Sequence, residues 1–272
     1  MRKTIQLIII ILSLVAATSC NGQKTEGSTT EVVLETTLGE IHIALYDDTP
    51  GHRDNFISNV KAGKYDGVTF HRVIRNFMIQ TGDPDTRPGE VADTTKAPER
   101  IDAEIVWPHH FHKRGMVGAA RDGDDENPHR MSDKYQFYIV TGKTCNEADM
   151  GDYEDARAQR EAEALFQKKQ MAKKSELDAL RASRDKYALS DMLEKLQDEA
   201  RYEISENPPI TYPKDLVRTY RTVGGAPWLD NEYTVFGEVT EGMAIVEKIQ
   251  KVKTDANDCP LAEIRVVRAY VK

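Results

Sequence analysis

This 272-residue chain has fewer positive than negative charges: it carries 37 Lys and Arg and 45 acidic residues, which gives a net charge of -8. Phosphate backbones are bound by basic surfaces, so this balance argues against nucleic acid as a partner. A long apolar run is also missing. The longest, residues 5–17, is shorter than the roughly 20 residues that a membrane-spanning helix needs. With 30% charged and 39% hydrophobic residues, the composition predicts a soluble globular protein with one extended, highly charged segment.

Residues 1–19 have the pattern of an export signal, since Arg2 and Lys3 precede the apolar run. Small residues then lead to Cys20 and a polar stretch that ends at residue 30. This arrangement resembles a bacterial lipoprotein signal, in which the cysteine becomes the lipid-modified first residue of the mature chain. The resemblance implies lipidation at Cys20, a flexible tether over residues 20–30, and an exported lipoprotein anchored to a membrane of the bacterial cell envelope. Plain secretory cleavage with an incidental cysteine is the alternative.

Cysteine is scarce as well, with three in the whole chain. If lipid occupies Cys20, only Cys145 and Cys259 are left to pair in an oxidising compartment. The sequence leaves open whether they form a disulfide or remain free thiols. No nucleophile motif surrounds Cys145, so we do not expect it to be catalytic.

Alternating apolar residues after position 31 predict short strands. Val32 and Leu34, then Ile41 and Ile43, flank a glycine-containing turn and predict a hairpin. Thr49 and Pro50 fit the N-cap and first turn of a helix that ends near Gly63. Further strands are predicted over residues 69–74, 77–80, 115–120, 136–140, 234–239 and 264–271, with a short helix over 243–250. This pattern favours a mainly β fold, a closed eight-stranded antiparallel barrel capped by helices.

Strands stop between about residues 146 and 221. Residues 151–206 hold 14 acidic and 11 basic residues, no proline and only one glycine, Gly151. Ala, Glu, Lys, Arg and Leu in this mixture predict helix, and seven apolar residues give a narrow stripe at helical spacing: Leu177, Leu180, Leu189, Met192, Leu193, Leu196 and Ala200. We therefore predict a barrel over residues 31–145 and 222–272, interrupted by a charged helical hairpin over 146–221. The hairpin either decorates the barrel, binds a partner, or acts as a dimerisation coil.

The block FHRVIRNFMIQTGDP at residues 70–84 places Arg72 in an apolar strand. A buried arginine is costly unless its donors find partners, so Arg72 is expected to have a function. Met78 and Gln80 lie two residues apart and share one face of their strand. The block resembles the central motif of the cyclophilin family of peptidyl-prolyl isomerases, departing mainly at Arg75, Asn76 and Thr81.

Two further blocks resemble the same family: GMVGAAR at 115–121 with YQFYI at 135–139, and WLDNEYTVFG at 228–237. The resemblance implies that Arg72 is catalytic and that the substrate is bound by Phe77, Met78, Gln80, Ala120, Arg121, Gln136, Tyr138, Trp228, Leu229 and Tyr233. Tyr138 stands where phenylalanine is common in the family, and Tyr233 where histidine is common. The alternative role for Gln136 is to brace Arg72 or a loop.

Prolyl isomerisation disrupts amide resonance against a barrier of about 18–20 kcal/mol. No bond breaks, so the predicted reaction requires neither a nucleophile, a cofactor nor a metal. The resemblance assigns to Arg72 a donor role toward the prolyl nitrogen, whose lone pair becomes available only in the twisted state. His109, His110 and His112 cluster in sequence, but no further ligand lies at a recognisable spacing, and a solvated loop is the preferred interpretation.

The sequence thus predicts a monomeric peptidyl-prolyl cis-trans isomerase that acts on X-Pro bonds of exported proteins during folding. The alternative is a membrane-anchored chaperone or proline-segment binding module with weak or no isomerase activity, in which the helical insertion binds clients.

Overall fold

The computed structural model describes residues 30–90 and 97–272. The predicted export signal, the lipidation site at Cys20 and nearly all of the predicted tether lie outside the described residues. Within the two described ranges, no helix has the length and apolar character required to cross a membrane.

Eight antiparallel strands form one curled sheet in the order β10-β1-β2-β9-β6-β8-β4-β3. Their bounds are β1 (Glu31–Thr36), β2 (Gly39–Leu45), β3 (Arg72–Ile74), β4 (Met78–Thr81), β6 (Met116–Ala119), β8 (Phe137–Val140), β9 (Val235–Glu241) and β10 (Val266–Val271). A second, small sheet pairs β5 (Arg100–Ile101) with β7 (Ser132–Asp133). The predicted mainly β fold class is confirmed.

The predicted closure of the barrel is wrong, because the two edge strands β3 and β10 share no ladder in the described part of the chain. Ahead of β3, an isolated bridge joins Thr69 to Arg265, and backbone hydrogen bonds join residues 67–70 to residues 264–266, but these contacts do not continue into a ladder. Opposite β3 lies a turn: the Val73 N–H donates to the carbonyl of Asp258 at 2.8 Å, and Asp258 has a left-handed backbone, φ 62°. Since β10 begins only at Val266, the sheet closes over part of its circumference and remains a half-barrel.

Two helices cover the sheet, α1 (Pro50–Lys61) and α6 (Met243–Ile249). Thr49 lies at the N-cap of α1 and Pro50 in its first turn, as predicted, but the Thr49 side chain makes no cap hydrogen bond. Glu104 takes that role, and its two carboxylate oxygens accept from the N–H groups of Gly51 and His52 at 2.9 and 2.8 Å. A negative charge is favoured at a helix N-terminus by the helix dipole.

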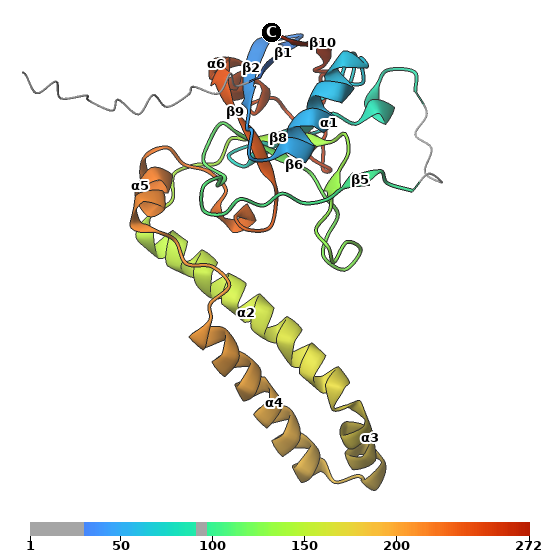
Figure 1. Cartoon of the computed structure of the whole chain (residues 1–272), viewed down its shortest axis with the longest axis vertical. Helices are drawn as coiled ribbons and strands as arrows, with labels where there is room; N and C mark the ends of the chain where they lie inside the picture. The colour runs from blue at the N-terminus through green and yellow to red at the C-terminus, as the bar shows by residue number, and fades with distance from the viewer. Residues whose placement is uncertain (1–29, 91–96) are drawn as a thin grey trace, which may run out of the picture.

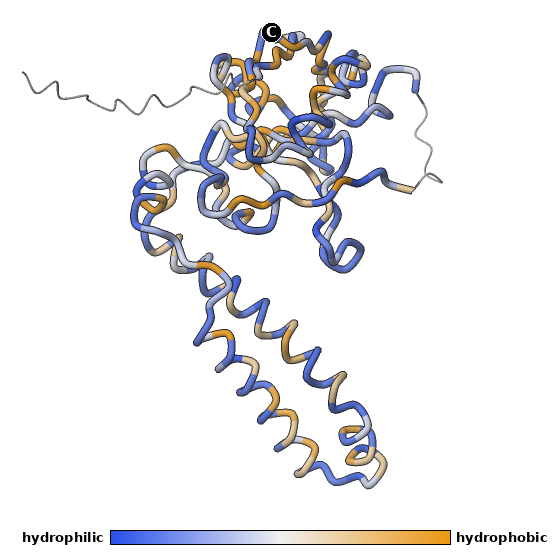
Figure 2. The backbone as a smooth tube through the Cα atoms, in the orientation of Figure 1, coloured by the Kyte–Doolittle hydropathy of each residue, from blue (hydrophilic) through white to orange (hydrophobic). Residues whose placement is uncertain are grey.

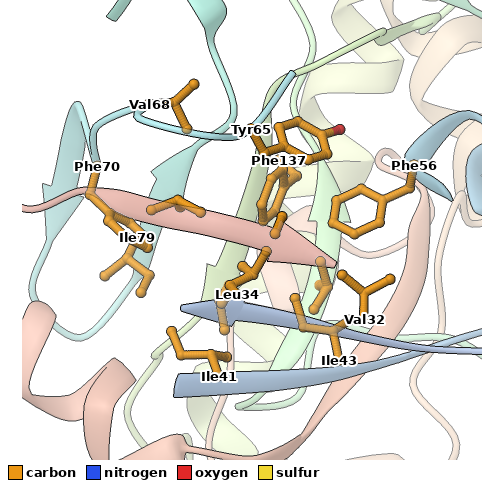
Figure 3. Close-up of a cluster of buried hydrophobic side chains, with 14 of the residues drawn as sticks. Val32, Leu34, Ile41, Ile43, Phe56, Tyr65, Val68, Phe70, Ile79 and Phe137 are labelled. Carbon is orange, nitrogen blue, oxygen red and sulfur yellow. The ribbon is translucent and has the colours of Figure 1, made fainter. Parts of the chain in front are cut away.

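The main core lies between the curled sheet and these helices (Figure 3). Inward-facing residues of β1 and β2 alternate with outward ones, so Leu34 and Ile41 are fully buried. Phe56 of α1 meets Phe137 of β8 edge to face, with ring centroids 5.0 Å apart. Aromatic pairs of this geometry contribute beyond their buried area, and they fix α1 over the sheet.

Four helices replace strands after residue 146: α2 (Glu147–Ala172), α3 (Lys174–Ser183), α4 (Lys186–Glu206) and α5 (Lys214–Thr222). Figure 1 shows α2 and α4 side by side, extending away from the sheet, with α3 at the far tip. The predicted helical hairpin is therefore present, while its treatment as a separate insertion over 146–221 remains a prediction. Two 3-10 turns complete the fold, η1 (Pro84–Thr86) and η2 (Pro227–Leu229).

The hairpin is held by a narrow apolar contact and by exposed ion pairs. Leu177, Leu196 and Ala200 of the predicted stripe are buried, and Lys169 of α2 pairs with Glu203 of α4 at 2.6 Å. In Figure 2 the helices of the hairpin carry more hydrophilic colour than the strands. Exposed pairs of this kind contribute about 0–1 kcal/mol each, so the hairpin has less to stabilise it than the sheet.

Candidate active site

Nine of the eleven predicted catalytic and substrate-binding residues line one pocket of about 140 Å³ on the outer side of the sheet. They are Arg72, Phe77, Met78, Gln80, Ala120, Arg121, Tyr138, Leu229 and Tyr233. The other two, Gln136 and Trp228, do not line it.

Sheet register places the pocket residues in a row. Arg72 of β3 lies opposite Gln80 of β4, Gln80 lies opposite Tyr138 of β8, and Tyr138 lies opposite Gly118 of β6. Directly opposite residues point to the same face of a sheet, so a guanidinium, an amide and an aromatic ring follow one another across three strands. Gly118 makes room for the ring, since a Cβ there would lie 2.4 Å from Cζ of Tyr138.

Arg72 is not buried, contrary to the expectation that its charge is enclosed in an apolar strand. Its side chain is 47% exposed, and Nε lies 3.8 Å from a carboxylate oxygen of Asp258. The reason is that β3 is an edge strand, where Val73 points into the core and Arg72 points outward. The guanidinium therefore stands at the pocket rim with donors available to a ligand.

Gln136 and Trp228 contact side chains that line the pocket. Gln80 Nε2 donates to Gln136 Oε1 at 2.9 Å, which fixes the Gln80 amide. Gln136 thus contacts Gln80, and not Arg72 as the alternative for this residue proposed. The Trp228 ring packs against Phe77, with centroids 5.2 Å apart.

Arg121 and Tyr233 form the opposite rim. The guanidinium carbon of Arg121 lies 4.4 Å from the centre of the Tyr233 ring, a cation–π distance. Arg121 Nε donates to the carbonyl of Glu232 at 3.0 Å, and its Nη1 pairs with Asp124 at 2.7 Å. Because these contacts occupy Arg121, Arg72 is the cation of the pocket with the looser pairing.

A buried polar network beneath the pocket was missed by the sequence reasoning. The hydroxyl of Tyr138 lies 2.8 Å from Nε2 of His112, and Nδ1 of His112 lies 2.8 Å from Asp230. Burial raises the pKa of the Tyr138 hydroxyl well above its usual value, so it stays protonated. The tyrosine in place of the common phenylalanine was the available signal, because a buried hydroxyl needs a partner.

The solvated-loop interpretation of the three histidines is correspondingly wrong for His112, which is 1% exposed. His110 is half-buried, stacks on Tyr46 at 4.0 Å between ring centroids and pairs with Asp48 at 2.7 Å. His109 alone is exposed. The described residues contain no group of three or more His, Cys, Asp or Glu arranged to hold a metal ion.

Cys145 and Cys259 are both free, so the disulfide alternative is wrong and the free-thiol alternative is confirmed. Cys145 is buried at the base of the insertion, and Cys259 is exposed in the turn beside β3. Burial raises the pKa of the Cys145 thiol, which disfavours the nucleophilic thiolate.

Known proteins resemble this chain along most of its length. Residues 31–154 and 219–271, more than half of the chain, match the family described as cyclophilin type peptidyl-prolyl cis-trans isomerase/CLD. A Staphylococcus epidermidis protein bearing the name of a peptidyl-prolyl cis-trans isomerase is 28% identical over 237 residues, covering 86% of this chain and 87% of its own. Peptidyl-prolyl cis-trans isomerase CYP71 of Arabidopsis thaliana is 27% identical over 241 residues, 88% of this chain and 24% of its own.

Solved structures support the same fold. A crystal structure of a Cryptosporidium parvum cyclophilin type peptidyl-prolyl cis-trans isomerase superposes with a TM-score of 0.52 at 17% identity, covering 90% of this chain and 98% of that one. A second structure of that protein, obtained in the presence of the dipeptide Ala-Pro, gives 0.51 at 17% identity, covering 89% and 98%. The matched residues include the whole pocket, and the chain belongs to the cyclophilin-type peptidyl-prolyl cis-trans isomerase family, whose activity, EC 5.2.1.8, it shares.

Proposed function

We propose that Arg72 is the catalytic residue of this isomerase and that the apolar part of the pocket binds the proline ring. The observation that carries the proposal is the shared lining: an exposed guanidinium borders the same 140 Å³ space as Phe77, Met78, Tyr138 and Leu229. Apolar walls with a loosely paired guanidinium at the rim suit a five-membered ring attached to an amide.

The geometry supplies what the reaction needs. Rotation about the X-Pro bond frees the lone pair of the prolyl nitrogen, and an Arg72 N–H can donate to it in the twisted state. This hydrogen bond is stronger in the transition state than in either planar state, so it lowers the barrier. Gln80 donates one of its two amide hydrogens to Gln136, which leaves its Oε1 to accept an N–H of the substrate backbone and its second N–H to donate.

Steady-state isomerisation of a short Xaa-Pro peptide tests the assignment. Replacing Arg72 with alanine should lower kcat/KM by about 10²–10³-fold, the range seen for removal of one transition-state donor. Arg75→Ala is the matched control, because it removes the same charge three residues away, in an exposed turn outside the pocket. Equal rates for the wild type and both variants would contradict the assignment.

Export and anchoring are a separate proposal, supported by the sequence of residues 1–30. The basic residues, the apolar run and the small residues before Cys20 favour a lipid-anchored protein whose clients are X-Pro segments of exported proteins. Uncatalysed exchange takes tens to hundreds of seconds and can limit folding. Cys20→Ala should move the protein from the membrane fraction to the soluble fraction. Retention of the variant in the membrane would contradict anchoring through Cys20.

A further inference from the structure

Four side chains form a continuous buried chain of hydrogen bonds, which we call the Asp230 network: Tyr138, His112, Asp230 and Tyr220. The Tyr138 hydroxyl meets His112 Nε2 at 2.8 Å, His112 Nδ1 meets Asp230 Oδ1 at 2.8 Å, and the Tyr220 hydroxyl meets Asp230 Oδ2 at 2.6 Å. The four residues are exposed by 4%, 1%, 0% and 0%. Water therefore cannot readily replace any of these partners.

The direction of each hydrogen bond follows from Asp230. Its carboxylate accepts from the backbone N–H of His112 at 2.8 Å and from Tyr220, so Nδ1 of His112 also donates to it. In the tautomer that carries its proton on Nδ1, the imidazole presents Nε2 as an acceptor, and the hydroxyl of Tyr138 donates to Nε2. Every member of the network is satisfied, which is the condition under which a buried polar network stabilises one arrangement.

The two ends of the network belong to different parts of the molecule. Tyr138 is a wall of the proline pocket, whereas Tyr220 lies in α5 at the base of the helical insertion. Asp230 directly follows η2, the turn that brings Leu229 into the pocket. The network thus spans from the insertion to two of the residues against which a proline ring would pack.

Other residues of the insertion hold the same turn. The Tyr212 hydroxyl donates to the carbonyl of Pro227 at 2.5 Å, and Nη2 of Arg157 donates to the carbonyl of Asp230 at 3.0 Å. The Tyr153 ring of α2 packs against Trp228, with centroids 5.5 Å apart. The base of the insertion therefore contacts Pro227, Trp228 and Asp230 directly.

We propose that His112, Asp230 and Tyr220 are positioning residues of the isomerase, through which the base of the insertion sets the shape of the proline pocket. The inference rests on the proposed proline-binding function of that pocket. Tyr138 is held on three sides: by Gly118 beneath its ring, by Tyr233 across it with centroids 6.2 Å apart, and by His112 at its hydroxyl. The third contact is the one that depends on the insertion.

A loosened pocket has a kinetic effect that differs from a lost catalytic group. The proline ring is bound in the ground state and in the transition state alike, so a poorer pocket raises KM and leaves kcat nearly unchanged. Loss of a transition-state donor such as Arg72 lowers kcat instead. If a variant is only partly folded, less active enzyme is present, so the apparent kcat falls while KM is unchanged. A raised KM therefore distinguishes a positioning residue from one that only supports folding.

Tyr220→Phe tests the proposal, because it removes one hydroxyl outside the pocket. A buried hydrogen bond lost in this way should raise KM for an Xaa-Pro peptide by about three- to tenfold, with kcat within about twofold of the wild type. Tyr202→Phe is the matched control, since the same hydroxyl is removed from a side chain that is 65% exposed on α4. An unchanged KM in Tyr220→Phe would overturn the proposal.

A double-mutant cycle adds a second test. Tyr138→Phe removes the hydroxyl at the other end of the network, and the variant with both changes should have a KM close to that of the weaker-binding single variant, because residues of one network couple. Strictly multiplicative effects on KM would overturn the proposal. An active wild type with an equally active Arg72→Ala variant would instead refute the catalytic assignment, so the two failures are distinguishable.

Discussion

The curled sheet and the helical insertion are stabilised in different ways. The sheet encloses a continuous apolar core in which Leu34, Ile41, Ile43 and Ile79 are fully buried. The insertion has a narrow apolar stripe, and its outer surface carries ion pairs such as Lys173 with Glu176 at 2.7 Å. Its base is different again, because it joins the sheet through buried hydrogen bonds centred on Asp230.

This contrast suggests a division of roles. A dense apolar core gives rigidity, which a catalytic residue needs for fixed geometry, and Arg72 lies on the sheet. A buried polar network is directional and specifies one arrangement, and it holds the 227–230 turn. The far end of the hairpin, around α3, has neither a dense apolar core nor a buried polar network. We therefore expect it to open locally at a lower free energy than the sheet.

The largest difference should appear when a buried side chain is removed from the sheet core or from the apolar stripe of the hairpin, and the free energy of unfolding is measured. Phe137→Ala removes a ring that contacts Phe56 and Tyr65, and should lower the free energy of unfolding by about 3–5 kcal/mol. Leu196→Ala on α4 should change the main unfolding transition by less than about 1 kcal/mol, since the hairpin can open by itself. Denaturant unfolding measures both. Equal shifts would show that the two regions unfold as one unit.

Gly118→Ala sharpens the comparison at the pocket. The added methyl group would meet the Tyr138 ring at 2.4 Å, and overpacking of this kind should cost about 1–3 kcal/mol of stability. Displacing the ring should also reduce kcat/KM by about 10- to 100-fold. Gly123→Ala is the control, because nothing lies within 4 Å of its Cβ position. Normal turnover by Gly118→Ala would show that the Tyr138 position is not required.

The stability of the sheet region should depend moderately on pH. Burial lowers the pKa of His52 and outweighs the opposing effect of the hydrogen bond that His52 donates to Glu104. The unfolded chain therefore takes up this proton more readily than the folded chain. The associated stability is present above the unfolded pKa of about 6.5 and is lost as the pH falls through that value toward the folded pKa.

Thermal unfolding at pH 7 and pH 5 measures this effect, which we expect to be on the order of 1 kcal/mol. His52→Gln should unfold with a smaller difference between the two pH values. A wild-type difference that survives this substitution would assign the pH dependence to other groups.

Shortening the hairpin should have the smallest effect on isomerase activity. Replacing residues 168–198 by a short Gly/Ser linker removes α3, the C-terminal end of α2 and most of α4, and keeps Arg157 and Tyr220. Isomerisation of a short peptide should stay within about twofold of the wild type, since Arg157, Tyr212 and Tyr220, which bond the 227–230 turn, are all kept. A large loss would extend the positioning role to the whole hairpin.

The same variant tests the client-binding alternative. Tyr187 and Tyr202 are 92% and 65% exposed on α4, and the deletion removes Tyr187. If the hairpin binds clients, the variant should assist the refolding of a proline-free client less well than the wild type does. Unchanged assistance would remove the reason for a client-binding arm.

Local features were predictable from the sequence because they depend on neighbouring residues. The hairpin of β1 and β2 follows from the alternation around Gly39, and the helices of the insertion follow from composition. The grouping of Arg72 with Tyr138 and Leu229 was also correct, although it came from a family resemblance. The pattern of apolar residues does not specify which strands pair.

Features that depend on distant partners were missed. The exposure of Arg72 depends on β3 being an edge strand, and the open edge depends on the turn at Asp258. His112 was weighed only as a metal ligand or a loop residue, because its partner Asp230 is 118 residues away. The cap of α1 by Glu104 is a long-range contact of the same kind.

One measurement tests the central claim most directly: saturation curves of Arg72→Ala and Tyr220→Phe on the same Xaa-Pro peptide, beside the wild type. We predict that Arg72→Ala lowers kcat at similar KM, since it removes a contact made in the transition state, and that Tyr220→Phe raises KM at similar kcat. If both variants change the same parameter in the same direction, catalysis on the sheet and positioning from the insertion are not separate functions, and the account is wrong.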